Sequence, residues 1–85
     1  MSYWWMSFCD PERPEGTRFL GALVIYACNE TEAIEKSHLL KLNPGGEVMF
    51  FEIPRKYEYR IPIEWIDCKL LSREECDEFD KKWSN

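Results

Sequence analysis

Two pairs of neighbouring aromatic residues, Trp4-Trp5 and Phe50-Phe51, constrain the fold of this chain more than any other feature of its sequence. Each pair lies in a short apolar segment, and residues 3–9 alternate with the period of two that is typical of a β-strand. Adjacent residues of a strand point to opposite faces of a sheet, so each pair places large rings on both faces. We therefore expect a sheet whose two faces both need to be covered.

Two further strands, with a fourth edge strand as one alternative, complete the predicted sheet. Residues 19–28 are an almost continuous apolar run with β-branched residues in the middle, which indicates a buried strand. Residues 10–17 are rich in turn formers and charge, so the first two strands should form an antiparallel hairpin. Residues 47–53 are expected to be a third strand. The alternation in residues 57–65, interrupted by Pro62, predicts an edge strand or an extended arm.

Two capping patterns delimit the predicted helices. Asn29, with Glu32 three positions later, is a variant of the capping box, and the helix that follows should end at the turn of residues 43–46. Lys36 of this helix is expected to point outward. Ser72 and Glu75 form a second capping box. The inward-facing stripe of this second helix is expected to contain Cys76, Phe79 and Trp83.

The composition supports one folded domain. The chain has 85 residues, of which 45% are hydrophobic and 32% charged, so it can form one core but is too short for two domains. A helix between the second and third strands predicts a right-handed crossover that makes these strands parallel. The sequence thus predicts a single α+β domain over residues 1–85, with a two-layer β-β-α-β-(β)-α arrangement, a small mixed sheet and two helices.

Charge and cysteine spacing narrow the classes of partner and cofactor. The net charge of −5 disfavours binding to a phosphate backbone, so nucleic acid is not an expected partner. The apolar N-terminal stretch reaches Asp10 too soon for a signal sequence or a membrane span, which favours a cytoplasmic protein without a membrane partner. The four cysteines form no C-x-x-C pair and are expected to be reduced, partly buried thiols that hold no metal.

The sequence contains no recognisable catalytic motif. The turn of residues 43–46 follows a helix C-terminus, whereas a phosphate-binding loop precedes a helix N-terminus. His38 is the only histidine, and whether it meets a thiol in the fold stays open. Residues 55–60 interleave basic and aromatic residues, but Glu58 and the acidic chain disfavour binding to single-stranded nucleic acid. We expect no enzymatic activity and no cofactor.

One resemblance covers most of the chain. It is carried by Trp5, residues 19–22, the first predicted helix, the segment Asn-Pro-Gly-Gly-Glu-Val at 43–48 and residues 70–75. In these parts the chain resembles small single-domain bacterial or phage-borne proteins of unassigned function. The Asn-Pro-Gly-Gly-Glu-Val turn is the most specific part of this resemblance. It implies a compact single domain and no particular activity.

The second face of the sheet leads to the predicted function. Two helices are expected to cover one face, and aromatic rings left in water on the other would forfeit several kcal/mol at about 25 cal/mol per Å². Either residues 57–71 fold over this face or another protein chain covers it. We expect a non-enzymatic interaction module that self-associates through Tyr3, Trp5 and Phe51. The alternatives are a small-ligand-binding domain and an acidic inhibitor of a nucleic-acid-binding protein.

Overall fold

Three strands form one antiparallel sheet in the computed structural model, which describes the backbone of residues 1–84 and the side chains of residues 1–79. β1 is Ser2–Cys9, β2 is Phe19–Ala27 and β3 is Glu47–Glu52, in the order β2-β1-β3. β2 and β3 run in the same direction, as predicted, because each is antiparallel to β1. They are not neighbours, however, so the sheet is antiparallel throughout and not mixed.

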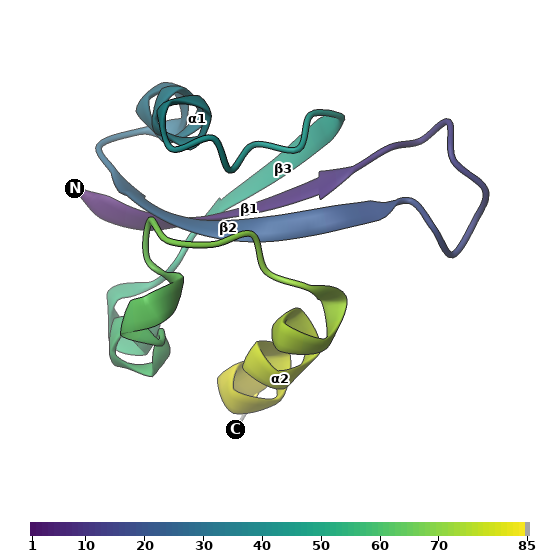
Figure 1. Ribbon diagram of the computed structural model, residues 1–85. Helices are drawn as coiled ribbons and strands as arrows, with labels where there is room; N and C mark the ends of the chain where they lie inside the picture. The colour runs from purple at the N-terminus through teal and green to yellow at the C-terminus, as the bar shows by residue number, and fades with distance from the viewer. Residues whose placement is uncertain (85) are drawn as a thin grey trace.

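Two α-helices and two 3-10 helices complete the fold. α1 is Glu30–Leu39, η1 is Arg55–Arg60, η2 is Ile63–Trp65 and α2 is Arg73–Ser84. α1 lies on one face of the sheet, and η1, η2 and α2 lie on the other (Figure 1). The predicted α+β class is confirmed. The arrangement has three layers where two were predicted, because the helices cover opposite faces.

The capping residues confirm where both α-helices begin. The Asn29 side chain accepts a hydrogen bond from the Glu32 N–H at 2.8 Å. Ser72 and Glu75 form a reciprocal box, in which each side chain accepts from the other's N–H, at 3.3 and 3.1 Å. The hydrogen bond from Lys69, together with that from the Ser72 backbone, lowers the pKa of Glu75 below its ordinary value.

α1 ends before the turn that was predicted to stop it. Its last residue is Leu39, and Lys41 adopts a φ of 60°, a left-handed conformation that cannot continue the helix. The Asn43 side chain instead donates to Ser37 Oγ at 3.1 Å and accepts from the Gly45 N–H at 2.8 Å. The turn of residues 43–46 therefore connects the end of the helix to β3.

Residues 57–65, predicted as an edge strand or an extended arm, form most of η1 and all of η2 instead. A proline occupies the N-cap position of each 3-10 helix, where its fixed φ and missing N–H are tolerated. Ile61 and Trp65 are buried, whereas Tyr59 and Ile63 are 76% and 83% exposed. Burial thus repeats every four residues, and the alternation in the sequence does not correspond to the two faces of a strand.

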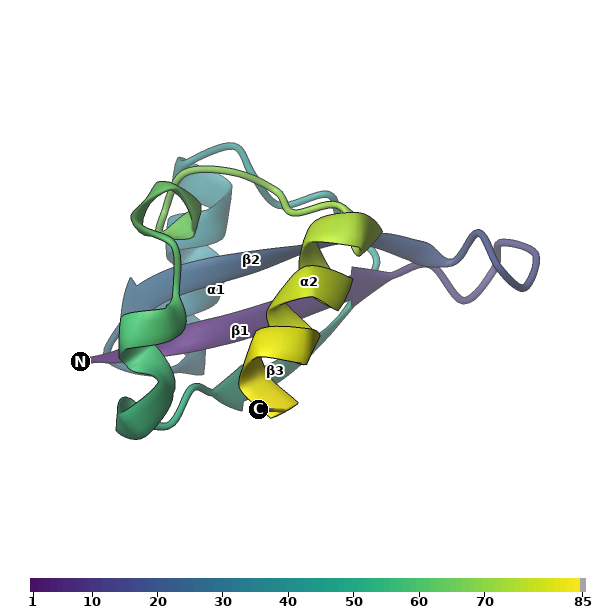
Figure 2. The same cartoon turned by 90° about the horizontal axis from the view of Figure 1, so that it is seen from below.

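The sheet separates two clusters of buried side chains. The cluster on the α1 face contains Met6, Phe8, Leu23, Ile25, Ala27 and Ala33. The cluster on the other face contains Trp5, Ala22, Val24, Ile53, Ile61, Trp65, Leu71, Cys76 and Phe79. Residues 57–71 and α2 therefore supply the cover for the second face from within the chain (Figure 2). Trp83, predicted to join this cluster, lies outside the described side chains.

Candidate interaction surface

The three residues predicted to form an interaction surface lie on the α2 face, and they differ in exposure. Trp5 is buried and stacks on Phe79, with the ring centroids 5.3 Å apart. Tyr3 is half-buried against Tyr26, with ring centroids at 4.7 Å. Phe51 is 46% exposed and contacts Trp5. The expectation that this face needs cover from another chain is wrong, because residues 57–71, the other cover that the sequence allowed, fold over it together with α2.

The outer edge of β2 is hydrogen-bonded to a later segment of the same chain. Ala22 and Leu71 exchange both backbone hydrogen bonds, at 3.2 and 2.7 Å. The Asp67 N–H donates to the Val24 carbonyl at 2.9 Å, and the Asp67 carboxylate accepts from the Tyr26 N–H at 3.2 Å. Residues 66–71 therefore close this edge of the sheet, along which they run in Figure 2.

Lys36 completes the closure of the β2 edge from α1. Its ammonium group donates to the Tyr26 carbonyl at 2.9 Å and to the Asp67 carboxylate at 2.7 Å. Asp67 has a φ of 56°, in the left-handed region that aspartate tolerates better than most residues. The prediction that Lys36 points away from the protein is wrong, because the side chain turns back to these partners across the edge.

Among the residues that the structure describes, none closes the outer edge of β3 in a comparable way. The Ile53 N–H donates to the Tyr3 carbonyl at 2.9 Å, which shows which residues of β3 direct their backbone groups toward β1. Alternate residues of an antiparallel strand face opposite edges, so Val48, Phe50 and Glu52 direct their N–H and C=O groups away from β1. Within the described part of the chain, no hydrogen bond to these outward groups is found.

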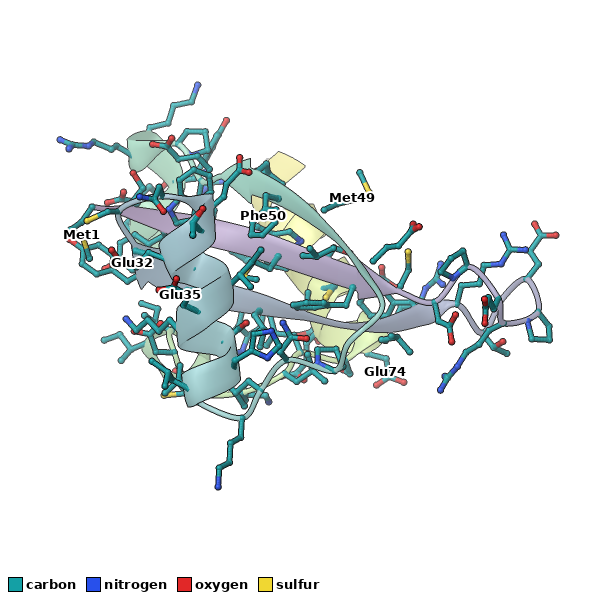
Figure 3. The ribbon with its side chains drawn as sticks, turned by 90° about the horizontal axis from the view of Figure 1, so that it is seen from above. Met1, Glu32, Glu35, Met49, Phe50 and Glu74 are labelled. Carbon is teal, nitrogen blue, oxygen red and sulfur yellow. The ribbon has the colours of Figure 1, made fainter. Side chains whose placement is uncertain are left out.

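Apolar side chains flank this open edge on both faces. Met49 is 73% exposed and lies on the α2 side, opposite Ser7 of β1. Phe50 is half-buried and packs against the cluster on the α1 side. Figure 3 shows Met49 projecting beyond the margin of the sheet. Glu47–Glu52 carries charge only at its two ends and contains no lysine or proline, two of the residues that protect an exposed strand edge. We call the outward groups of 48, 50 and 52, together with Met49, the β3 edge.

A small cavity lies between α2 and the sheet, on the same face as Met49. Its volume is about 280 Å³, and it is lined by Trp5, Ser7, Phe19, Arg73, Cys76 and Asp77. Ligand pockets usually measure roughly 300–1,000 Å³, so this cavity has room for a small molecule at most. Its aromatic rings, with one guanidinium and one carboxylate group, would suit a small aromatic compound that carries a charge.

The other candidate residues do not gather into a site. His38 is exposed on α1. Cys28 and Cys68 are exposed, so the prediction of four partly buried thiols is wrong for these two, while Cys9 is half-buried and Cys76 buried. In residues 1–79, no three histidine, cysteine, aspartate or glutamate side chains are placed to hold a metal ion. None of the described helices has the length and apolar character to cross a bilayer.

The fold and this surface define the class as a small α+β domain with one closed and one open sheet edge. Comparisons with protein-family models, with curated proteins and with solved structures find no match to this chain. The resemblance carried by residues 43–48 therefore stays a prediction.

Proposed function

We propose that this chain is a non-enzymatic protein-interaction module that binds an extended segment of a protein chain along the β3 edge. The observation that carries the proposal is the difference between the two edges of one sheet. The β2 edge is hydrogen-bonded to residues 66–71 and to Lys36, whereas the outward groups of the β3 edge receive no hydrogen bond from the described residues. An extended peptide satisfies such groups by adding a strand.

The side chains beside the β3 edge would select among such peptides. Met49 lies on the α2 side and Phe50 on the α1 side, so alternate residues of an added strand would contact different apolar neighbours. Methionine adapts readily to partners of different shape. Glu47 and Glu52 lie at the two ends of the apolar stretch. They favour a partner that does not place acidic residues opposite them.

Selection of a displayed library of random peptides on the immobilised protein tests this proposal. Glu52→Pro and Glu52→Ala both remove the carboxylate that accepts from Ser2 Oγ at 2.8 Å, but only proline also removes the outward N–H. We expect the selected peptides to bind wild type and Glu52→Ala alike, and to bind Glu52→Pro about fivefold to tenfold more weakly. Circular dichroism checks that both variants fold. The absence of any peptide with this dependence contradicts the proposal.

Small-ligand binding is a second candidate function, supported by the cavity beside Trp5. Arg73 and Asp77 contribute opposite charges next to the rings of Trp5 and Phe19. We expect a small aromatic carboxylate to shift the NMR signal of the Arg73 side chain, and Arg73→Gln to weaken that binding. If the NMR signals of the lining residues do not shift at millimolar concentrations of such compounds, this candidate function is excluded.

An acidic inhibitor of a nucleic-acid-binding protein is the third candidate, and the surface supports it least. Asp77 and Glu78 are exposed on α2. Arg73 is exposed on the same helix, and Lys69 forms an ion pair with Glu75. These cations interrupt the continuous negative surface that imitation of a nucleic acid requires.

A further inference from the structure

We infer that the strand bound at the β3 edge is β3 of a second copy of this chain, in an antiparallel pair centred on Phe50. This inference rests on the function proposed above and names the partner. A two-fold axis perpendicular to the sheet would join the two sheets into one, with strand order β2-β1-β3-β3-β1-β2. Each copy then satisfies the backbone groups that the other leaves open.

The choice of residues in β3 whose backbone groups point outward selects this register. Phe50 pairs with Phe50 of the second copy and Val48 with its Glu52, so that all the outward-facing residues exchange hydrogen bonds. A shift in one direction would bring in Pro54, which has no N–H to donate. A shift in the other direction would bring in Gly46, whose φ of 76° is outside the strand region. The register centred on Phe50 avoids both residues.

The same register places compatible apolar side chains opposite each other. Met49 lies opposite Phe51 of the second copy on the α2 side, and the two-fold axis repeats this pair. A methionine sulfur beside an aromatic ring is a favourable contact. On the α1 side, the two Phe50 rings are cross-strand neighbours, which is also a stabilising pair. Met49 and Phe51 are 73% and 46% exposed in the single chain, so the pairing would remove apolar surface from water.

The charges at the ends of β3 are complementary under the same symmetry. Glu52 lies opposite Val48 and not opposite another glutamate. Glu47 begins the strand, and the exposed residues Arg55 and Lys56 follow shortly after its end. Because the pair is antiparallel, Glu47 of each copy lies at the end of the interface where the other copy's chain leaves β3 toward Arg55 and Lys56. Such an arrangement favours association and fixes the register.

We expect this association to be weak. Addition of one short strand buries less surface than the roughly 1,200 Å² typical of stable protein interfaces. The dimer should therefore form at high micromolar protein concentrations and dissociate on dilution, and the experiments are designed for that range.

Cysteine cross-linking tests the register directly. Met49→Cys and Phe51→Cys are prepared separately in a chain whose Cys9, Cys28 and Cys68 are replaced by serine. In the proposed pair, positions 49 and 51 face each other with Cα atoms about 4.5 Å apart, within reach of a disulfide. Identical positions lie diagonally, about 7–8 Å apart, which is too far for a disulfide. We expect the mixed variants to cross-link at least about tenfold faster than either variant alone. Equal rates in all three samples overturn the register.

Sedimentation equilibrium under reducing conditions gives a second measurement with the native cysteines in place. Glu52→Pro removes an outward N–H from each copy, whereas Glu52→Ala keeps it. We expect wild type and Glu52→Ala to dimerise alike, and Glu52→Pro to dimerise about tenfold or more weakly. Met49→Lys should also weaken the dimer, because lysine at an edge opposes strand pairing. Met49 is 73% exposed, so this variant should keep its fold.

The outcomes separate this inference from the proposed function. The wild type could be strictly monomeric while displayed peptides still bind and need the Glu52 N–H. That result overturns the second copy as the partner but supports the proposed interaction module. A monomeric wild type for which no such peptide is found overturns both.

Discussion

Gly45 and Gly46, in the turn before β3, share a left-handed conformation but have different surroundings. Their φ angles are 83° and 76°, in the region that favours glycine. A Cβ atom at Gly45 would meet open space. A Cβ atom at Gly46 would collide with the backbone carbonyl oxygen of Cys9. The two positions therefore separate the cost of a left-handed backbone from the cost of close packing.

Gly46→Ala should destabilise the protein more than Gly45→Ala. For Gly45→Ala we expect a loss of about 1 kcal/mol in the free energy of unfolding, from backbone strain alone. For Gly46→Ala we expect about 2–4 kcal/mol, because the turn must also shift away from Cys9. Urea titrations of the two variants measure the difference. Equal losses would mean that the strand end relaxes around the added methyl group.

The closure of the β2 edge depends on one residue that links three segments. Asp67 accepts hydrogen bonds from the Tyr26 N–H and the Lys36 ammonium group, and its own N–H donates to Val24. These contacts tie β2, α1 and residues 66–71 together. Removal of the carboxylate should therefore loosen the edge without changing the strand order.

Asp67→Ala is expected to lower the free energy of unfolding by about 2–3 kcal/mol, through lost hydrogen bonds and an unfavourable left-handed alanine. Asp67→Asn should cost about 1 kcal/mol, because asparagine keeps an acceptor oxygen and tolerates this backbone conformation. Denaturant titration gives the stabilities, and amide exchange of Tyr26 reports on the edge itself. A Tyr26 amide that stays equally protected in Asp67→Ala would show that the carboxylate does not close the edge.

At the scale of the whole molecule, a group of aromatic rings around Phe79 holds the layer on the α2 face together. Trp5 is 8% exposed and nearly parallel to Phe79, with 9° between the ring planes. Trp65 approaches the same ring, with the centroids 5.6 Å apart. These contacts join β1, the 3-10 segment and α2, so the layer below the sheet in Figure 1 depends on them.

Trp5→Ala should cost about 3–5 kcal/mol, as expected for a buried aromatic residue. That is a large share of the roughly 5–15 kcal/mol that stabilises a typical domain. Met49→Ala, on the same face but exposed, should change stability by about 0.5 kcal/mol or less. Circular dichroism during urea unfolding measures both. If Trp5→Ala unfolded at the wild-type midpoint, the aromatic group around Phe79 would not be the core of this face. A charge at position 5 is accordingly expected to unfold the single chain.

Much of the local structure follows from residues that are close in the sequence. The caps at Asn29 and Ser72 were predictable because each partner lies three positions away. The strands around Trp4-Trp5 and Phe50-Phe51 were predictable because alternation and apolar content are local properties. The α+β class follows from these elements, and so does the need to cover both faces of the sheet.

The tertiary structure alone decided which segments cover the two faces of the sheet and which surface is left exposed. Lys36 and Asp67 are 31 positions apart, and nothing between them indicates that they meet. Sequence reasoning identified Phe51 but missed Met49 and the outward backbone groups. The direction of those groups depends on which residues of β3 form hydrogen bonds with β1. The lack of lysine or proline in residues 47–52 was a signal, but it became informative only once β3 lay at an edge. Local patterns choose the elements, whereas strand order and edge closure arise from contacts between distant residues.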